Sequence, residues 1–179
     1  APYLAVIHRL DQPVEGILVF GKTKNAAASL TRQLTRNGFK KYYEAMAEGT
    51  PPAASGTLTD YLIRDGRTNC SAVCSPDTMG SKKAVLEYQV LAQYETNGKC
   101  LSHLRIQLQT GRHHQIRVQF SHAGCPLFGD RKYNPDGIPV SRLYLCACQL
   151  DFLHPSTGKL LHFEIQPFFY EEFDKSSPS

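Results

Sequence analysis

Two stretches in the middle of the chain alternate apolar and polar residues with a period of two. In the first, apolar side chains stand at every second position from 86 to 94, and in the second they stand at every second position from 104 to 108. This period is typical of half-buried β-strands. Asn97-Gly98 lies between the stretches and is a strong hairpin turn signal. The pattern therefore predicts a long antiparallel hairpin.

Helical patterns lie on both sides of this hairpin. Thr23 is a suitable N-cap for a helix that runs to about residue 37, where Gly38 can end it. Residues 114–123 predict a second, shorter helix with apolar positions one turn apart. The remaining apolar runs are short, and they predict further strands at 16–20, 41–48, 56–63, 143–152 and 160–165.

The order of these elements predicts the fold class. Residues 64–83 are polar and predict a long loop or irregular ribbon, and the tail 171–179 is expected to be frayed. Strands outnumber helices and do not alternate with them, which favours an α+β fold with a mixed, mainly antiparallel sheet and flanking helices. We expect residues 1–179 to form a single domain.

Composition places the chain among ordinary globular proteins, with 41% hydrophobic and 20% charged residues. Its apolar runs are too short to cross a bilayer, and its first residues do not resemble a signal peptide. We therefore expect a cytoplasmic protein with no membrane partner.

The six cysteines are irregularly spaced, which favours reduced thiols over a disulfide framework. Zinc binding is the alternative, because Cys70 lies near Cys74 and Cys146 near Cys148. No CxxC pair is present, however, and the second two cysteines fall in a predicted strand, where small buried residues are expected.

The net charge of +4 is only mildly basic, but the basic residues fall in two groups. The groups are Lys22, Lys24, Arg32, Arg36, Lys40 and Lys41, and Arg105, Arg112, Arg117, Arg131 and Lys132. Each group could be a solvated surface on its own. Together they favour a polyanionic partner.

Three segments carry candidate chemistry. Residues 8–11 place Asp11 two residues after an arginine, just before an apolar run. Residues 110–117 contain two arginines where a strand ends and a helix begins, and a helix N-terminus attracts anions. Residues 41–45 form an aromatic strand that can present a ring for stacking.

Each segment also has a structural interpretation. Asp11 and Arg9 can form a loop ion pair of little energetic consequence. Tyr43 can simply be half-buried in its strand. Arg112 and Arg117 can bind a phosphate or carboxylate without any catalytic role.

Taken together, the segments resemble the RluA-type pseudouridine synthases. The matching motifs are His8-Arg-Leu-Asp11 followed by Gly16-Ile-Leu-Val-Phe-Gly-Lys22, Lys41-x-Tyr43-x-Ala45 with Glu48-Gly49, Gly111-Arg-His-His-Gln-Ile-Arg-Val118, and Gly124-Cys-Pro-Leu-Phe-Gly-Asp-Arg-Lys-Tyr133. They follow the family order over most of the chain, and the set is far more specific than any one motif.

The sequence departs from the family pattern in three places. Val14 and Glu15 stand where the family usually has Thr-Ser, and His113 stands where it usually has threonine. The family also carries a strand with a Lys-Pro-x-Gly motif upstream of residue 8, and we expect this catalytic domain to lack its N-terminal strand or strands.

The resemblance implies the pseudouridine synthase catalytic fold and the isomerisation of specific uridines to pseudouridine in ribosomal or transfer RNA. It implies RNA as the partner and no metal or nucleotide cofactor, and we expect a monomer. The implied catalytic residues are Asp11, Tyr43 and Arg117, with Arg117 as the ion partner of Asp11. The implied RNA-binding residues are Arg9, Arg112, His114, Gln115, Lys22 and Lys41.

Two other hypotheses remain from the sequence. The chain can be an RNA-binding member of the fold with impaired catalysis, which Val14 and Glu15 favour. A metal hydrolase that uses His113, His114 and His122 is less favoured, because no HExxH-type spacing is present.

Overall fold

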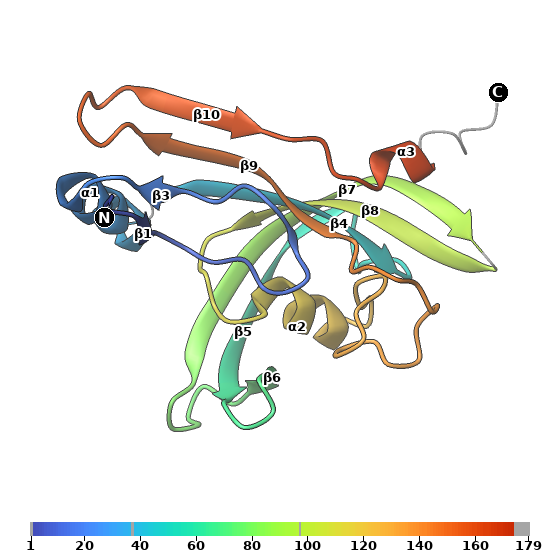
Figure 1. The fold of residues 1–179 in the computed structure, drawn as a ribbon. Coiled ribbons are helices and arrows are strands. Elements are labelled where there is room, and N and C mark those ends of the chain that lie inside the picture. The colour runs from blue at the N-terminus through green and yellow to red at the C-terminus, as the bar shows by residue number, and fades with distance from the viewer. Residues whose placement is uncertain (1, 37, 97, 174–179) are drawn as a thin grey trace.

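The computed structural model describes residues 2–36, 38–96 and 98–173, and it is built around one large, curved β-sheet (Figure 1). The strands are β1 (Ala5–Val6), β2 (Glu15–Gly16), β3 (Phe20–Gly21), β4 (Lys40–Glu48), β5 (Ser55–Asp65), β6 (Cys70–Cys74), β7 (Lys82–Thr96), β8 (Lys99–Leu108), β9 (Leu145–Leu153) and β10 (Leu160–Glu164). The helices are α1 (Lys24–Thr35), α2 (Gln115–His122) and α3 (Tyr170–Phe173).

The strand order in the large sheet is β10-β9-β4-β8-β7-β5-β6, and every neighbouring pair along this path is antiparallel. The short β2 pairs with β9 in parallel, and β1 and β3 form a separate two-stranded ribbon. The predicted α+β class with a mixed, mainly antiparallel sheet is confirmed.

The central hairpin is also confirmed. β7 and β8 pair from Leu86↔Leu108 to Thr96↔Lys99, with one irregularity after Val90. The predicted turn includes Asn97, which lies outside the described residues. Most of the hairpin's apolar positions are buried on one face, as a period of two requires.

Thr23 caps α1 as predicted. Its hydroxyl oxygen accepts a hydrogen bond from the backbone N–H of Ala26 at 3.1 Å, which satisfies one of the free donors at the helix start. The helix ends at Thr35, and Gly38 N–H donates to the carbonyl oxygen of Gln33 at 2.7 Å. The cap lies where the sequence indicated.

The predicted continuous buried strand at 16–20 is wrong. The segment pairs with β9 only as far as Gly16 and then leaves the sheet to pair with β1. A Cβ on Gly16 would lie 2.5 Å from the Cβ of Ala147, so only glycine permits this close approach. Ile17 then packs toward α1, while Leu18 is 40% exposed.

Residues 64–83, predicted as a loop or irregular ribbon, contain the regular strand β6, which pairs with β5. The turn between them is held by the Asp65 carboxylate, which accepts from Arg67 N–H and the Thr68 hydroxyl. Asn69 adopts a left-handed conformation with φ of 52°. β6 consists mostly of small residues, so its sequence carries little periodic signal.

At the C-terminus, the frayed tail was expected to begin at residue 171. The structure instead has α3 up to Phe173, packed against Tyr94 and Tyr144. Residues 174–179 lie outside the described part of the chain. Within that part, no helix is both long enough and apolar enough to cross a membrane.

Strand β4 separates two parts of the core. Tyr43, Ala45 and Ala47 pack in the cluster that includes α2, whereas Met46 packs in the cluster that includes α3. Figure 1 shows α2 within the curve of the sheet. The alternation along β4 therefore directs Tyr43 toward α2, which is the side of the sheet that carries the candidate site.

Candidate active site

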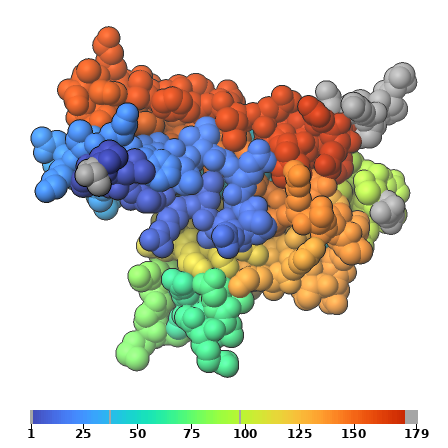
Figure 2. Space-filling model, viewed as in Figure 1, coloured from blue at the N-terminus to red at the C-terminus, as the bar shows by residue number. Residues whose placement is uncertain are grey.

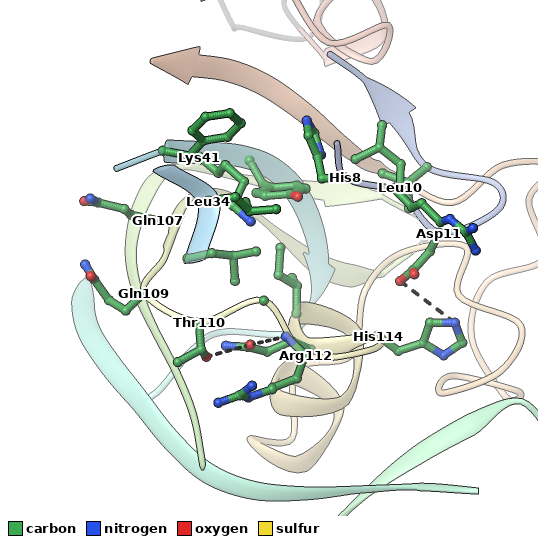
Figure 3. Close-up of a pocket in the computed structure, with 18 of the residues that line it drawn as sticks. His8, Leu10, Asp11, Leu34, Lys41, Gln107, Gln109, Thr110, Arg112 and His114 are labelled. Carbon is green, nitrogen blue, oxygen red and sulfur yellow. Dashed lines mark hydrogen bonds and ion pairs between the residues drawn. The ribbon is translucent and has the colours of Figure 1, made fainter. Parts of the chain in front are cut away.

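Segments that are far apart in the sequence meet around one cavity of about 760 Å³. Figure 2 shows the N-terminal segment lying against the segment around residue 110 on one face of the molecule. The cavity is lined by residues 8–11, the end of α1, β4, and the chain from the end of β8 into α2 (Figure 3). A cavity of this size is in the range of ligand pockets.

Asp11 lies on the wall of this cavity, in the loop between β1 and β2. Its side chain is 31% exposed, and its Oδ2 lies 3.9 Å from Nε2 of His114. Burial raises the pKa of the Asp11 carboxyl, while the charges of Arg117 and His113 act in the opposite direction. The carboxylate is thus partly desolvated, which makes it more basic than an exposed aspartate.

Tyr43 reaches the same cavity from β4, with 8% of the residue exposed. Burial and the nearby Asp11 charge raise the pKa of its phenol above the ordinary value. The hydroxyl therefore stays protonated at neutral pH and is a proton donor in the resting site.

Arg117 does not pair directly with Asp11, which corrects the prediction from the sequence. Its Nε and Nη2 each lie 2.7 Å from a carboxylate oxygen of Asp130, and both side chains are almost fully buried. The third guanidinium nitrogen, Nη1, is buried and has no hydrogen-bond partner within the described part of the chain. Arg117 therefore acts on Asp11 through its charge, which lowers the pKa of Asp11.

The comparisons with known proteins agree with this arrangement of motifs. A family model described as "RNA pseudouridylate synthase" matches residues 1–122. The chain belongs to this family. The RluA-type resemblance is thereby confirmed.

Two curated relatives of this synthase-family chain illustrate the similarity. An "Uncharacterized RNA pseudouridine synthase" of Chloroflexus aurantiacus is 36% identical over 160 residues, or 88% of this chain and 48% of that protein. "Ribosomal large subunit pseudouridine synthase D" of Neisseria meningitidis is 34% identical over 175 residues, or 91% of this chain and 45% of that protein. The chain spans about half the length of the curated relatives it matches.

The fold is also found in a solved structure, "Human RNA Pseudouridylate Synthase Domain Containing 1". The TM-score is 0.82 at 24% sequence identity, and the match covers 97% of this chain and 73% of that one. This likeness confirms the pseudouridine synthase fold.

Gln115 is a predicted RNA-binding residue whose side chain is already fully engaged. Its Oε1 accepts from the Thr110 hydroxyl and from Arg112 N–H, and its Nε2 donates to Val85 O and Gln119 Oε1. These four bonds exhaust the capacity of the amide. The structure therefore corrects the prediction: the Gln115 side chain holds the loop before α2 and has no donor or acceptor left for RNA.

The other predicted RNA-binding residues differ in position. Arg9, Arg112 and Lys41 line the cavity, and burial lowers the pKa of Lys41. Arg112 is exposed, although its Nε donates to Lys83 O. Lys22 is exposed and does not line the cavity. RNA contact by these four side chains stays a prediction.

His114 lines the cavity wall but is only 5% exposed. Burial first, and then the charge of Arg117, lower its pKa to about 4. The ring is therefore neutral at pH 7. Its Nδ1 lies 2.7 Å from the hydroxyl of Tyr133, a residue that the sequence placed only in a family-like loop.

Acid should destabilise the fold through His114. Its pKa is lowered on folding, so its contribution is complete above the unfolded pKa near 6.5 and is lost as pH falls toward 4. Between pH 7 and pH 4.5, we expect the wild type to lose on the order of 1–2 kcal/mol more unfolding free energy than His114→Gln. Urea unfolding at both pH values measures this, and equal losses would contradict it.

Proposed function

We propose that this chain isomerises specific uridines to pseudouridine in RNA, with Asp11 as the catalytic carboxylate. The observation that carries the proposal is the meeting of Asp11, Tyr43 and the Arg117 region around one cavity. By the resemblance, these residues correspond to the family's motif positions.

The isomerisation breaks the glycosidic bond, rotates the uracil and rejoins C5 to C1′. Asp11 either attacks the sugar or uracil, or assists proton removal from the sugar. Its partial desolvation favours both routes, because a carboxylate with few water contacts is a stronger nucleophile and base. Arg117 stabilises the charged form across the site.

Tyr43 would stack on the uracil and take part in the transfer of the C5 proton. A uridine must leave its helix or loop to enter the cavity, so base flipping is required. Arg9 would fill the gap that the flipped base leaves, and Arg112 and Lys41 would hold phosphates at the rim. Each such contact releases counterions from the RNA phosphates, so binding should weaken as salt increases.

Ribosomal or transfer RNA is the proposed substrate. The names of relatives in Neisseria meningitidis and Haemophilus influenzae, "Ribosomal large subunit pseudouridine synthase D", support ribosomal RNA as the first substrate to test. Chemical or mass-spectrometric mapping of pseudouridine in both RNA classes, with and without the protein, tests activity and target together. Identical maps would contradict the proposal.

Catalytic impairment is the second candidate, and Glu15 favours it. Glu15 is exposed at the start of β2, and it follows Asp11 by four residues in the sequence. The added negative charge opposes the approach of an RNA phosphate. Salt-sensitive RNA binding without tritium release from 5-tritiated uridine RNA would identify this alternative.

Tyr43→Phe should retain RNA binding but slow product formation by about tenfold or more, because the ring stays and the proton donor is lost. Tritium release measures the rate. Tyr42→Phe is the matched control, since Tyr42 lies on the same strand with Arg105 5.0 Å from its ring centroid and does not line the cavity. An unchanged rate in Tyr43→Phe would remove its proposed proton-transfer role.

A further inference from the structure

The geometry points to Tyr133 as a positioning residue that fixes the tautomer of His114 and thereby directs an N–H group at Asp11. This inference rests on the proposed function, because it assigns a role within the same site. It concerns a chain of contacts that begins in β6, passes through Tyr133 and His114, and ends at the catalytic carboxylate.

Two hydrogen bonds and one longer approach connect Ser71 to Asp11. The backbone N–H of Ser71 donates to the Tyr133 hydroxyl oxygen at 2.8 Å. That oxygen lies 2.7 Å from Nδ1 of His114, and Nε2 on the other side of the ring lies 3.9 Å from Oδ2 of Asp11. Figure 3 marks this last approach with a dashed line between the Asp11 carboxylate and the His114 ring.

The first half of the path determines the direction of the hydrogen bonds. Ser71 N–H is a backbone donor, so the Tyr133 oxygen must accept from it. The phenol then has one proton of its own to donate, and the nitrogen of His114 is the acceptor in reach. If Nδ1 carried a proton instead, the Tyr133 oxygen would accept from both Ser71 and His114, and the phenol proton would lose Nδ1 as its acceptor. Nδ1 is therefore the unprotonated nitrogen.

The second half of the path selects the same tautomer. A neutral imidazole has one N–H, so an unprotonated Nδ1 places the proton on Nε2. Nε2–H then faces the Asp11 carboxylate. In the opposite tautomer, a nitrogen lone pair would face that carboxylate and repel it.

His114 is held in this position by its surroundings. The His113 ring stacks on it with centroids 3.7 Å apart, and Nδ1 of His113 lies 2.9 Å from the Ser71 hydroxyl. The backbone of His114 adopts a left-handed conformation with φ of 53°. With the ring buried and flanked by the cationic Arg117 and Lys132, the neutral form is favoured.

At 3.9 Å, Nε2 and Oδ2 are too far apart for a direct hydrogen bond. The N–H group acts on Asp11 as an oriented dipole in the free protein. Catalytic hydrogen bonds commonly shorten when the substrate occupies the site. Tyr133 thus orients the group that supports Asp11 without touching the reacting atoms.

Nitrogen-15 NMR of the labelled full chain, without RNA, tests the tautomer directly. The two ring nitrogens of His114 are distinguished by their proton occupancy, and the resonances are assigned by their loss in His114→Gln. We expect Nε2–H in the wild type between pH 6 and 8, and a mixture of both tautomers in Tyr133→Phe. Nδ1–H in the wild type, or an unchanged tautomer in Tyr133→Phe, would overturn the inference.

Kinetics supply a second readout. Tyr133→Phe should lower kcat about tenfold, because one hydrogen bond to the positioning ring is lost, while KM changes less than about twofold. Tyr144→Phe is the matched control, since its hydroxyl donates to Glu172 and it does not line the cavity. A larger effect on KM than on kcat, or an equal effect in Tyr144→Phe, would overturn the positioning role.

The two proposals can fail separately. Absence of pseudouridine formation by the wild type would contradict the proposed function, while the NMR measurement still decides the tautomer. Nε2–H in the wild type that becomes a mixture of both tautomers in Tyr133→Phe supports the inference whether or not the wild type forms pseudouridine.

Discussion

Asp11→Asn should abolish tritium release from 5-tritiated uridine RNA, with a loss of about 10³-fold or more, while RNA binding persists. Asparagine keeps the shape of the side chain and removes the charge that either chemical route requires. The folded protein should not suffer, because burial raises the pKa of Asp11 and so disfavours its charged form. We expect the thermal midpoint to stay equal or to rise slightly.

Asp77→Asn is the matched control for this experiment. Asp77 is exposed in the turn after β6 and does not line the cavity, so its replacement should leave tritium release unchanged. Filter binding or anisotropy with the same RNA separates lost catalysis from lost affinity. Full turnover by Asp11→Asn would remove the catalytic assignment.

Asp130→Asn should destabilise the fold by about 3–5 kcal/mol, because it leaves the buried Arg117 guanidinium without a counter-charge. This is a large part of the stability of an ordinary domain. The loss should be visible as a lower urea midpoint with a similar slope. Glu164→Gln is the control, because Glu164 and its partner His162 are both more than half exposed, and we expect a change below about 0.5 kcal/mol.

The double variant Arg117→Met with Asp130→Leu separates stability from catalysis. Replacing both members of a buried ion pair by apolar side chains is often neutral or stabilising. We expect the double variant to recover only part of the stability lost in Asp130→Asn, because leucine no longer accepts from the backbone N–H groups of Lys132 and Tyr133. It should recover none of the tritium release, because the charge near Asp11 is gone. A stable and fully active double variant would contradict the catalytic role of Arg117.

Local patterns predicted those elements whose partners are near in sequence. The period of two in β7 and β8 is a property of each strand, and the Thr23 cap depends on a residue three positions away. β6 escaped prediction because its small residues carry little pattern and its stability comes from pairing with β5. The strand expected at 16–20 failed because an apolar run does not show which partner each part will pair with.

The site divides in the same way. The sequence predicted that Asp11, Tyr43 and Arg117 belong together, because their motifs occur in the family order. It gave the wrong partner for Arg117, since the loop after α2 returns Asp130 to the helix only in the folded chain. Gln115 likewise looked available for RNA, and only its four hydrogen bonds within the protein exclude this.

By itself, then, the sequence determined the family, the sheet-rich class and which residue is the candidate carboxylate, because these follow from residue types and their local spacing. Only the tertiary structure decided the environment of that carboxylate. Its desolvation, the charge of Arg117 and the approach of His114 all depend on segments that are far apart in the sequence and meet around one cavity. Burial and electrostatic interactions act through space, so residue order along the chain does not determine them.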